Sequence, residues 1–263
     1  MPDGAEDQPI LELRGINKSF GPVDVLKGVD FSVWPGKVTA LVGDNGAGKS
    51  TMVKCISGTY AIDSGDYLFE GQPVHVHSPR DASALGIEIV YQDLALCDNL
   101  DIVQNMFLGR ERVSGVVLDE SSMEQSAGET LKSLSVRTVS SVRQRVSSLS
   151  GGQRQTVAIA KAVLWNSRVV ILDEPTAALG VAQTAQVLAL VRRLADRGLA
   201  VVLISHNMLD VLEVADHIAV LYLGEMAAQV ARADVNQQQL VELITTGHLA
   251  GDRAAAVTKG PSA

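Results

Sequence analysis

Uninterrupted apolar runs alternate along this chain with stretches in which apolar residues recur every three or four positions. Buried strands are predicted at 38–42, 87–91, 169–172 and 200–204. Helices are predicted at 50–57, 156–163 and 185–191. Parallel strands are joined by crossover helices that cover both faces of the sheet, so this alternation predicts an α/β domain with a mostly parallel sheet.

Shorter patterns add an antiparallel β layer at the N-terminal end, because Leu11 and Leu13 alternate with polar residues and a turn follows at 20–22. This layer is predicted over residues 10–33. Smaller elements are predicted as a strand in 65–71, a helix from Ser78-Pro79 to near Gly86, a hairpin at 218–230 turning at Gly224, and a final helix at 236–246.

Residues 92–149 contain no strand run, are richer in serine and charge, and place Ile102, Asn105 and Met106 on one helical face. They predict a helical subdomain inserted into a core formed by 10–91 and 150–246. The whole unit, 10–246, is predicted to be one domain, and the tails at 1–9 and 247–263 are expected to be disordered.

The net charge of -8 disfavours sequence-independent binding to DNA or RNA, which requires a clustered basic surface. Two cysteines are too few for a disulfide framework, which favours a reducing cytoplasm. The N-terminus has no secretory signal pattern, and no apolar run reaches the length of a membrane span, so any membrane role is expected to depend on a partner.

A glycine-rich segment at 43–51, between a predicted strand and a predicted helix, matches G-x-x-x-x-G-K-[ST]. Its residues are Gly43, Asp44, Asn45, Gly46, Ala47, Gly48, Lys49, Ser50 and Thr51. Glycines let backbone N–H groups turn toward phosphates, and the helix N-terminus adds positive charge. Lys49 is expected to reach the terminal phosphates, Ser50 to bind Mg²⁺ through its hydroxyl, and Thr51 to pack or cap behind it. The alternative, a glycine-rich turn that matches by chance, is disfavoured by the strand and helix on either side. We call this segment the phosphate loop.

Two acids follow the apolar run at 169–172, at the strand end where open parallel sheets bind ligands. Successive strand side chains point in opposite directions, so Asp173 and Glu174 are expected to have different tasks. We interpret Asp173 as the carboxylate on the Mg²⁺ side and Glu174 as the base or polariser for an attacking water. The alternative is a pair of solvated strand-end acids.

A Ser-Gly-Gly turn at 149–153 precedes another predicted helix and could bind a second anion by the same physics. Taken alone, it could equally be an N-cap with a flexible approach. We call residues 149–153 the signature turn, and its polar and glycine positions are Ser150, Gly151, Gly152 and Gln153.

Together these motifs resemble the nucleotide-binding subunit of an ATP-binding cassette (ABC) transporter over residues 10–246. The resemblance implies an ATPase that uses ATP and Mg²⁺, with Glu174, His206 and Lys49 in catalysis. It also implies that Phe20 stacks on adenine and that Gln92 joins Ser50 and Asp173 at Mg²⁺. Read without the resemblance, Phe20 is a core aromatic, Gln92 a polar loop residue and His206 a capping histidine.

The resemblance further implies a head-to-tail dimer in which the signature turn of a second copy completes each ATP site. An integral membrane permease and, indirectly, a periplasmic or extracellular sugar-binding protein are the other implied partners, on the cytoplasmic face of the membrane. One position departs from the family pattern: Gly180 stands where many relatives have the aspartate of the D-loop, which puts that loop's usual contacts across the dimer in doubt.

The sequences at 43–46, 91–96, 105–109 and 174–179 are most similar to the subfamily that imports simple sugars, in its single-cassette form of the fructose or xylose type. The expected function is therefore ATP hydrolysis that energises import of a simple sugar. The alternative is an ABC-type ATPase coupled to another transporter or to a nucleic-acid or ribosome process, although the acidic charge disfavours nucleic acid as a partner.

Overall fold

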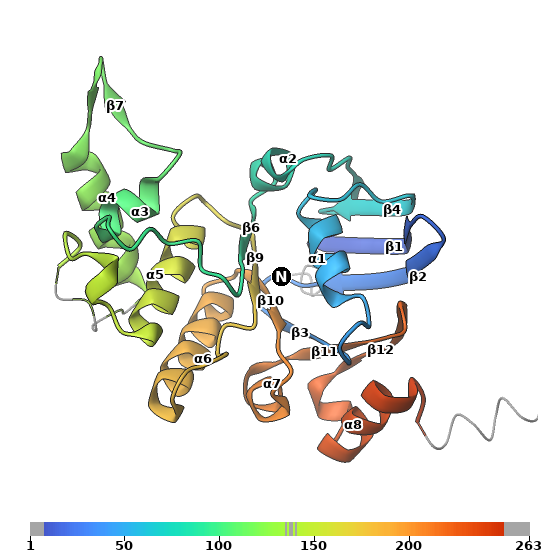
Figure 1. Cartoon of the computed structure of the whole chain (residues 1–263). Coiled ribbons are helices and arrows are strands. Elements are labelled where there is room, and N and C mark those ends of the chain that lie inside the picture. Colours follow the sequence, from blue (N-terminus) through green and yellow to red (C-terminus); the bar gives the residue numbers. More distant parts are fainter. Residues whose placement is uncertain (1–7, 135, 137–138, 140, 250–263) are drawn as a thin grey trace, which may run out of the picture.

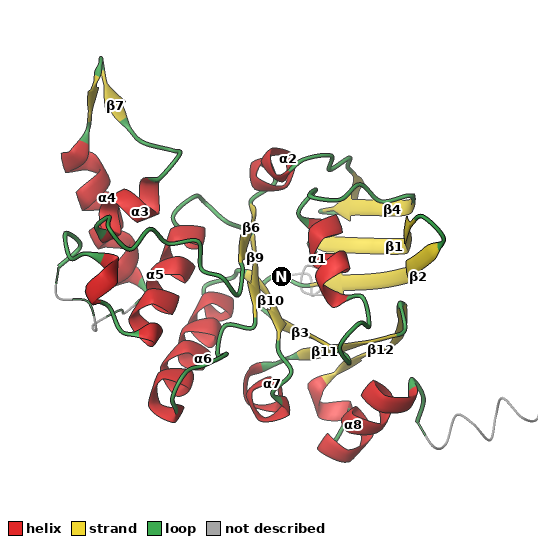
Figure 2. Cartoon of the chain, in the orientation of Figure 1, coloured by secondary structure: helices red, strands yellow, loops and turns green. Residues whose placement is uncertain are grey.

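The computed structural model of the chain describes residues 8–134, 136, 139 and 141–249, and two sheets with flanking helices organise them (Figures 1 and 2). Of the predicted disordered tails, 1–7 and 250–263 lie outside the described residues, and Gly247 forms the C-cap of the last helix. No helix in the described part of the chain is both long and apolar enough to cross a membrane.

The central sheet has six strands, and its order explains how residues from distant parts of the chain meet. Across the sheet they are β12 (Glu225–Ala231), β11 (His217–Tyr222), β3 (Val38–Val42), β10 (Ala200–Ile204), β9 (Val169–Asp173) and β6 (Ile87–Val90). All neighbours pair in parallel except β11 and β12, which form the predicted hairpin. Strands β3, β9 and β10 end side by side, so the loops that follow them are brought to the same edge.

The predicted N-terminal layer is confirmed as a second, antiparallel sheet. Its order is β2 (Val23–Val33), β1 (Leu11–Phe20), β4 (Ser64–Phe69) and β5 (Gln72–Pro73). Leu11 and Leu13 are fully buried, as the alternation requires, and Ile16 is buried because the register of β1 against β2 shifts between Leu13 and Ile16.

Helices lie on both faces of the central sheet, and α3 and α4 pack on α5 beyond it. The helices of the described residues are α1 (Lys49–Ile56), α2 (Pro79–Ala84), α3 (Ile102–Phe107), α4 (Glu120–Ser133), α5 (Gly151–Val163), α6 (Val181–Asp196), α7 (Met208–Val214) and α8 (Gln237–Thr246). Two single turns of 3-10 helix lie at Val146–Ser148 and Arg232–Asp234. Ser78 caps α2 by accepting a hydrogen bond from the Asp81 N–H, which explains the predicted start of that helix.

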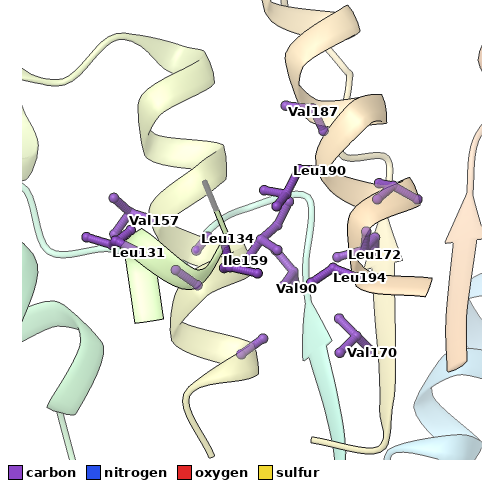
Figure 3. Packing of buried hydrophobic residues seen from close by; sticks show 14 of the residues in the cluster. Val90, Leu131, Leu134, Val157, Ile159, Val170, Leu172, Val187, Leu190 and Leu194 are labelled. Atoms are coloured by element: carbon purple, nitrogen blue, oxygen red, sulfur yellow. The ribbon is translucent and has the colours of Figure 1, made fainter. Parts of the chain in front are cut away.

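Side chains on alternate positions of the sheet strands belong to different cores. Val170 and Leu172 belong to a core that also contains Ile159 of α5 and Leu190 and Leu194 of α6 (Figure 3). Ile171, together with Val202 and Ile204, packs instead with α1 and the antiparallel sheet. The sheet therefore separates α1 from α5 and α6, as Figure 1 shows.

The segment predicted to be helical differs from expectation at one place. A two-stranded hairpin, β7 (Val113–Ser114) and β8 (Val117–Leu118), lies between α3 and α4, so the prediction that 92–149 contains no strand was wrong. Strands of two residues leave no alternating pattern that could be detected in the sequence. α5 contacts both α3 and α4 and also α6 and β6, and the predicted division of the chain at 149/150 stays a prediction.

Candidate active site

The phosphate loop connects β3 to α1, and its backbone geometry explains its glycines. Gly43 has a φ of +153°, and a Cβ at that position would lie 2.2 Å from the backbone oxygen of Leu221 in β11. Gly48 has a φ of +109°, and its Cβ would lie 3.0 Å from Leu26. These positive φ values are rarely adopted by residues with a side chain, and there is no space for one. The loop is therefore held tightly against β11 and β2.

Lys49 begins α1 and curls back over the loop. Its Nζ donates to the carbonyl oxygens of Gly43 (2.7 Å) and Asp44 (3.0 Å). Burial lowers the pKa of Lys49, while the nearby Glu174, Asp44 and Asp173 act in the opposite direction. The ammonium thus lies at the centre of the loop, where a phosphate oxygen could replace one of its carbonyl partners.

Asp173 is the last residue of β9 and Glu174 follows it, and both line the same cavity. The strand alternation behind the prediction of opposite directions does not extend to Glu174, because that residue leaves the strand with a left-handed φ of +50°. Such a φ is uncommon for a residue with a side chain and occurs often at functional sites. Burial raises the pKa of Asp173, Glu174 adds to this effect, and Lys49 opposes it. The acid pair is therefore well placed for a cation.

His206 lies in the loop after β10 and contacts the acid pair directly. The His206 Nδ1 lies 2.7 Å from Glu174 Oε2, with Glu174 largely buried and His206 open to solvent. The Glu174 N–H also donates to the carbonyl of Ile204 at 3.0 Å, which extends the pairing of β9 and β10 by one bond. The loops after these two strands are consequently joined at the point where the acid and the histidine meet.

These groups surround a cavity of about 380 Å³. Its lining consists of Asn45, Gly46, Gly48, Lys49, Ser50, Thr51, Gln92, Asp173, Glu174 and His206, together with the apolar residues Val25 and Ile204. Of the other phosphate-loop residues, Ala47 is buried and Asp44 accepts a hydrogen bond from the Asn45 N–H. Val25 and Ile204 were not predicted, since each looks like an ordinary strand residue in the sequence.

The described residues include no group of three His, Cys, Asp or Glu side chains that could hold a metal by themselves. Mg²⁺ commonly takes one or two carboxylates together with substrate phosphates and waters. The donor set present, a carboxylate at Asp173, a hydroxyl at Ser50 and an amide at Gln92, fits that hard cation, and all three residues line the cavity.

Phe20 and the signature turn lie outside this cavity lining. Phe20 ends β1 and is 42% exposed, with its ring edge-on to Tyr60 at 5.1 Å between centroids and Lys18 Nζ 5.3 Å from its centroid. It is therefore a surface aromatic rather than a core residue.

Ser150 caps α5, and its capping box with Gln153 is formed by the Ser150 N–H donating to Gln153 Oε1 (2.8 Å) and the Gln153 N–H donating to Ser150 Oγ (3.4 Å). A Cβ on Gly151 would lie 3.2 Å from Leu179, and one on Gly152 would lie 3.1 Å from Gln183. The signature turn therefore packs closely against Leu179 and Gln183, in the part of the chain that follows the acid pair. It lies on the α5 side of the sheet, away from α1 (Figure 1).

A phosphate loop, an acid pair and a histidine around one cavity, on a sheet with helices on both faces, define a nucleoside triphosphatase of the phosphate-loop class. A family model described as "ABC transporter" matches residues 26–177. The chain is 44% identical to the xylose/arabinose import ATP-binding protein XylG of Sulfolobus acidocaldarius over 237 residues, which cover 90% of this chain and 94% of that protein.

The fructose import ATP-binding protein FrcA of Rhizobium meliloti is 46% identical over 245 residues, with 90% of this chain and 94% of that protein covered. Among solved structures, a nucleotide-free ATP-binding cassette from an ABC transporter matches with a TM-score of 0.77 at 23% identity, over 97% of this chain and 100% of that one. The chain belongs to the ABC transporter family, and it is an ATP-binding and ATP-hydrolysing cassette of that family.

Proposed function

We propose that this chain is the ATPase subunit of an importer of simple sugars, and that the roles predicted for its site residues are correct. The assignment of the site rests on one observation: a single cavity is lined by the phosphate loop, Asp173, Glu174, Gln92 and His206. The sugar is supported by the names of the two relatives above, which cover nearly the same length as this chain.

In this proposal the phosphate loop binds the ATP phosphates through backbone N–H groups and Lys49. Ser50, Asp173 and Gln92 hold Mg²⁺, which would neutralise charge on the transferred phosphoryl group. Phe20 supports the adenine ring.

Glu174 accepts a proton from, or polarises, the water that attacks the γ-phosphate in line. His206, at 2.7 Å from Glu174, keeps that carboxylate oriented and senses or positions the γ-phosphate.

The substitution Glu174→Gln tests this role, since the amide retains the shape and cannot act as a base. We expect the turnover number for ATP to fall by about two to four orders of magnitude with ATP binding retained. Glu213→Gln, an exposed acid on α7, is the matched control and should hydrolyse ATP like wild type. Turnover near the wild-type rate in the Glu174 variant would remove that residue from the mechanism.

The signature turn lies outside the cavity lining of its own chain, so we propose that Ser150, Gly151, Gly152 and Gln153 act on ATP held by a second copy. The N-terminus of α5, a helix of 13 residues, would then point its N–H groups at the γ-phosphate from the opposite side. Each of the two sites would be complete only in the head-to-tail dimer.

Mixing two inactive variants tests this arrangement. One chain carries Lys49→Ala and the other carries Ser150→Arg. If the signature turn acts on the partner's ATP, the mixed dimer has one site with both defects and one site with neither. We expect ATP hydrolysis to reappear in the mixture while each variant alone stays inactive. If the turn instead acts within its own chain, every site is defective and no activity returns.

The membrane partner would be a permease, with a sugar-binding protein acting outside the membrane and this subunit held peripherally on the cytoplasmic face. A second cavity of about 280 Å³, beside Gln92, is the surface we assign to the permease. It is lined by Tyr91, Asp93, Leu94, Met106, Leu108 and, from α5, Lys161.

Two acids of the same segment have partners outside this cavity lining: Asp98 pairs with Arg154 at 2.9 Å, and Asp101 caps α3. The substrate assignment is tested by deleting the chain and measuring uptake of a panel of monosaccharides, while co-purification identifies the permease. Unchanged uptake of every sugar would refute the importer assignment and leave the ATPase intact.

A further inference from the structure

Asp210 lies in the first turn of α7 and is only 5% exposed, yet the roles above do not use it. Burying a carboxylate is unfavourable unless hydrogen bonds satisfy its oxygens. Here both oxygens have side-chain donors: Asn207 Nδ2 donates to Oδ1 at 2.9 Å, and Thr176 Oγ1 donates to Oδ2 at 2.7 Å.

The two donors come from the two loops that carry the reacting groups. Thr176 is two residues beyond Glu174 in the loop after β9, and Asn207 directly follows His206 in the loop after β10. The last backbone bond between these strands runs from the Glu174 N–H to Ile204. Beyond it the loops are joined by the contact between His206 and Glu174 itself and by the Asp210 carboxylate.

The orientation of Asn207 is itself held. Its Oδ1 accepts from the Leu209 N–H at 3.1 Å as the N-cap of α7, which leaves Nδ2 directed at Asp210. Asp210, Asn207 and Thr176 therefore form one connected set of hydrogen bonds fixed to the start of a helix.

We infer that Asp210 is a positioning residue that keeps the Glu174 loop and the His206 loop in register, so that their side chains meet at 2.7 Å. The inference rests on the proposed role of Glu174. A displacement of about 1 Å in a catalytic group can lower a rate about a hundredfold, so a link between the two loops matters for turnover more than for ATP binding.

Four substitutions separate this role from simple packing. Thr176→Val removes one donor and keeps the side-chain shape, and Asp210→Ala removes both acceptors. Asp210→Asn should restore both bonds, because its oxygen still accepts from Asn207 and the Thr176 hydroxyl can accept from the new amide instead of donating. Thr176→Ser keeps the hydroxyl. Thr130→Val is the matched control, since the Thr130 hydroxyl likewise donates one hydrogen bond (2.8 Å), in this case to the backbone carbonyl of Ser126, and lies in α4.

We expect Thr176→Val and Asp210→Ala to lower kcat for ATP about tenfold to a hundredfold, with the dissociation constant for ATP changed less than about threefold. Asp210→Asn, Thr176→Ser and Thr130→Val should remain close to wild type. The double variant Thr176→Val/Asp210→Ala should be no slower than Asp210→Ala alone, since both changes break the same link.

The idea is overturned if Thr176→Val turns over like Thr130→Val, or if kcat and ATP affinity fall together. If Asp210→Ala does not fold, the comparison of Thr176→Val with Thr176→Ser tests the positioning role of Asp210 instead. Glu174→Gln in the same assay separates the two proposals. If Glu174→Gln is inactive while Thr176→Val turns over at the wild-type rate, the positioning role of Asp210 is refuted and the catalytic role of Glu174 stands. A normal Glu174 variant refutes the catalytic assignment and this inference with it.

Discussion

Replacing Gly43 by alanine tests how tightly the phosphate loop is held. The new Cβ would lie 2.2 Å from the Leu221 backbone oxygen, whereas ordinary contacts begin at about 3.4 Å, so the loop or β11 has to move by more than 1 Å. β11 cannot yield freely, because it pairs with β3 on one side and β12 on the other. The backbone conformation at φ +153° adds strain for any residue with a side chain.

Overpacking and strain each cost about 1 to 3 kcal/mol, so we expect the Gly43 variant to lose about 2 to 6 kcal/mol of unfolding free energy. Gly46→Ala is the first comparison, because its φ is +84° with no atom within 4 Å, which leaves only a conformational cost of about 1 to 2 kcal/mol. Gly128→Ala is the second: it lies inside α4 with no atom within 4 Å, and it should stabilise by about 0.5 to 1 kcal/mol.

Urea unfolding of the four proteins measures these differences, and equilibrium binding of ATP reports the loop itself. We expect the stability order Gly128→Ala, wild type, Gly46→Ala, Gly43→Ala, with ATP affinity reduced in the last. A Gly43 variant as stable as the Gly46 variant would refute the reasoning, since the two differ chiefly in the Leu221 contact.

Other substitutions probe other parts of the molecule. Lys49→Ala should weaken ATP binding directly, because the loop loses its ammonium, and unchanged affinity in a binding assay would contradict the phosphate role. Phe20→Ala should raise the KM for ATP about tenfold through lost stacking on adenine, yet leave hydrolysis of inorganic triphosphate unaffected, and equal effects on both substrates would exclude stacking. Burial lowers the pKa of His217, which stacks on Trp34. The unfolded chain therefore binds a proton there at higher pH than the folded one, and wild type should lose stability as the pH falls from about 7 to 5. The substitution His217→Gln should reduce this loss, as urea unfolding at both pH values would show.

Much of the fold could be predicted because its strands are continuous apolar runs and its helices have clear caps. The strand at 38–42, the phosphate loop and α1 were placed from sequence alone, since each is a local pattern with a local physical cause. The short elements α7 and β7–β8 were not predicted. Seven and two residues, respectively, are too few for a periodic signal. α7 packs against α6, whereas the strand residues of the β7–β8 hairpin are exposed.

The candidate active site also has features that could be predicted from the sequence and features that could not. Gly43 could be predicted as a required glycine from its motif, but only the structure shows that the Leu221 carbonyl imposes the requirement. The left-handed turn at Glu174 could not be predicted, because a strand pattern implies alternation and carries no sign of where the alternation ends.

By itself, then, the sequence determined the class of fold, the phosphate loop and the identities of the acid pair and the histidine, because spacing along the chain encodes strands, helices and turns. Only the tertiary structure decided that His206 meets Glu174, that the signature turn lies outside its own chain's cavity lining, and that Asp210 joins Thr176 to Asn207. Thr176 and Asp210 are 34 residues apart, and no local pattern relates them. They meet because β9 and β10 are neighbours in the sheet, and which strands become neighbours is settled by packing of the whole domain.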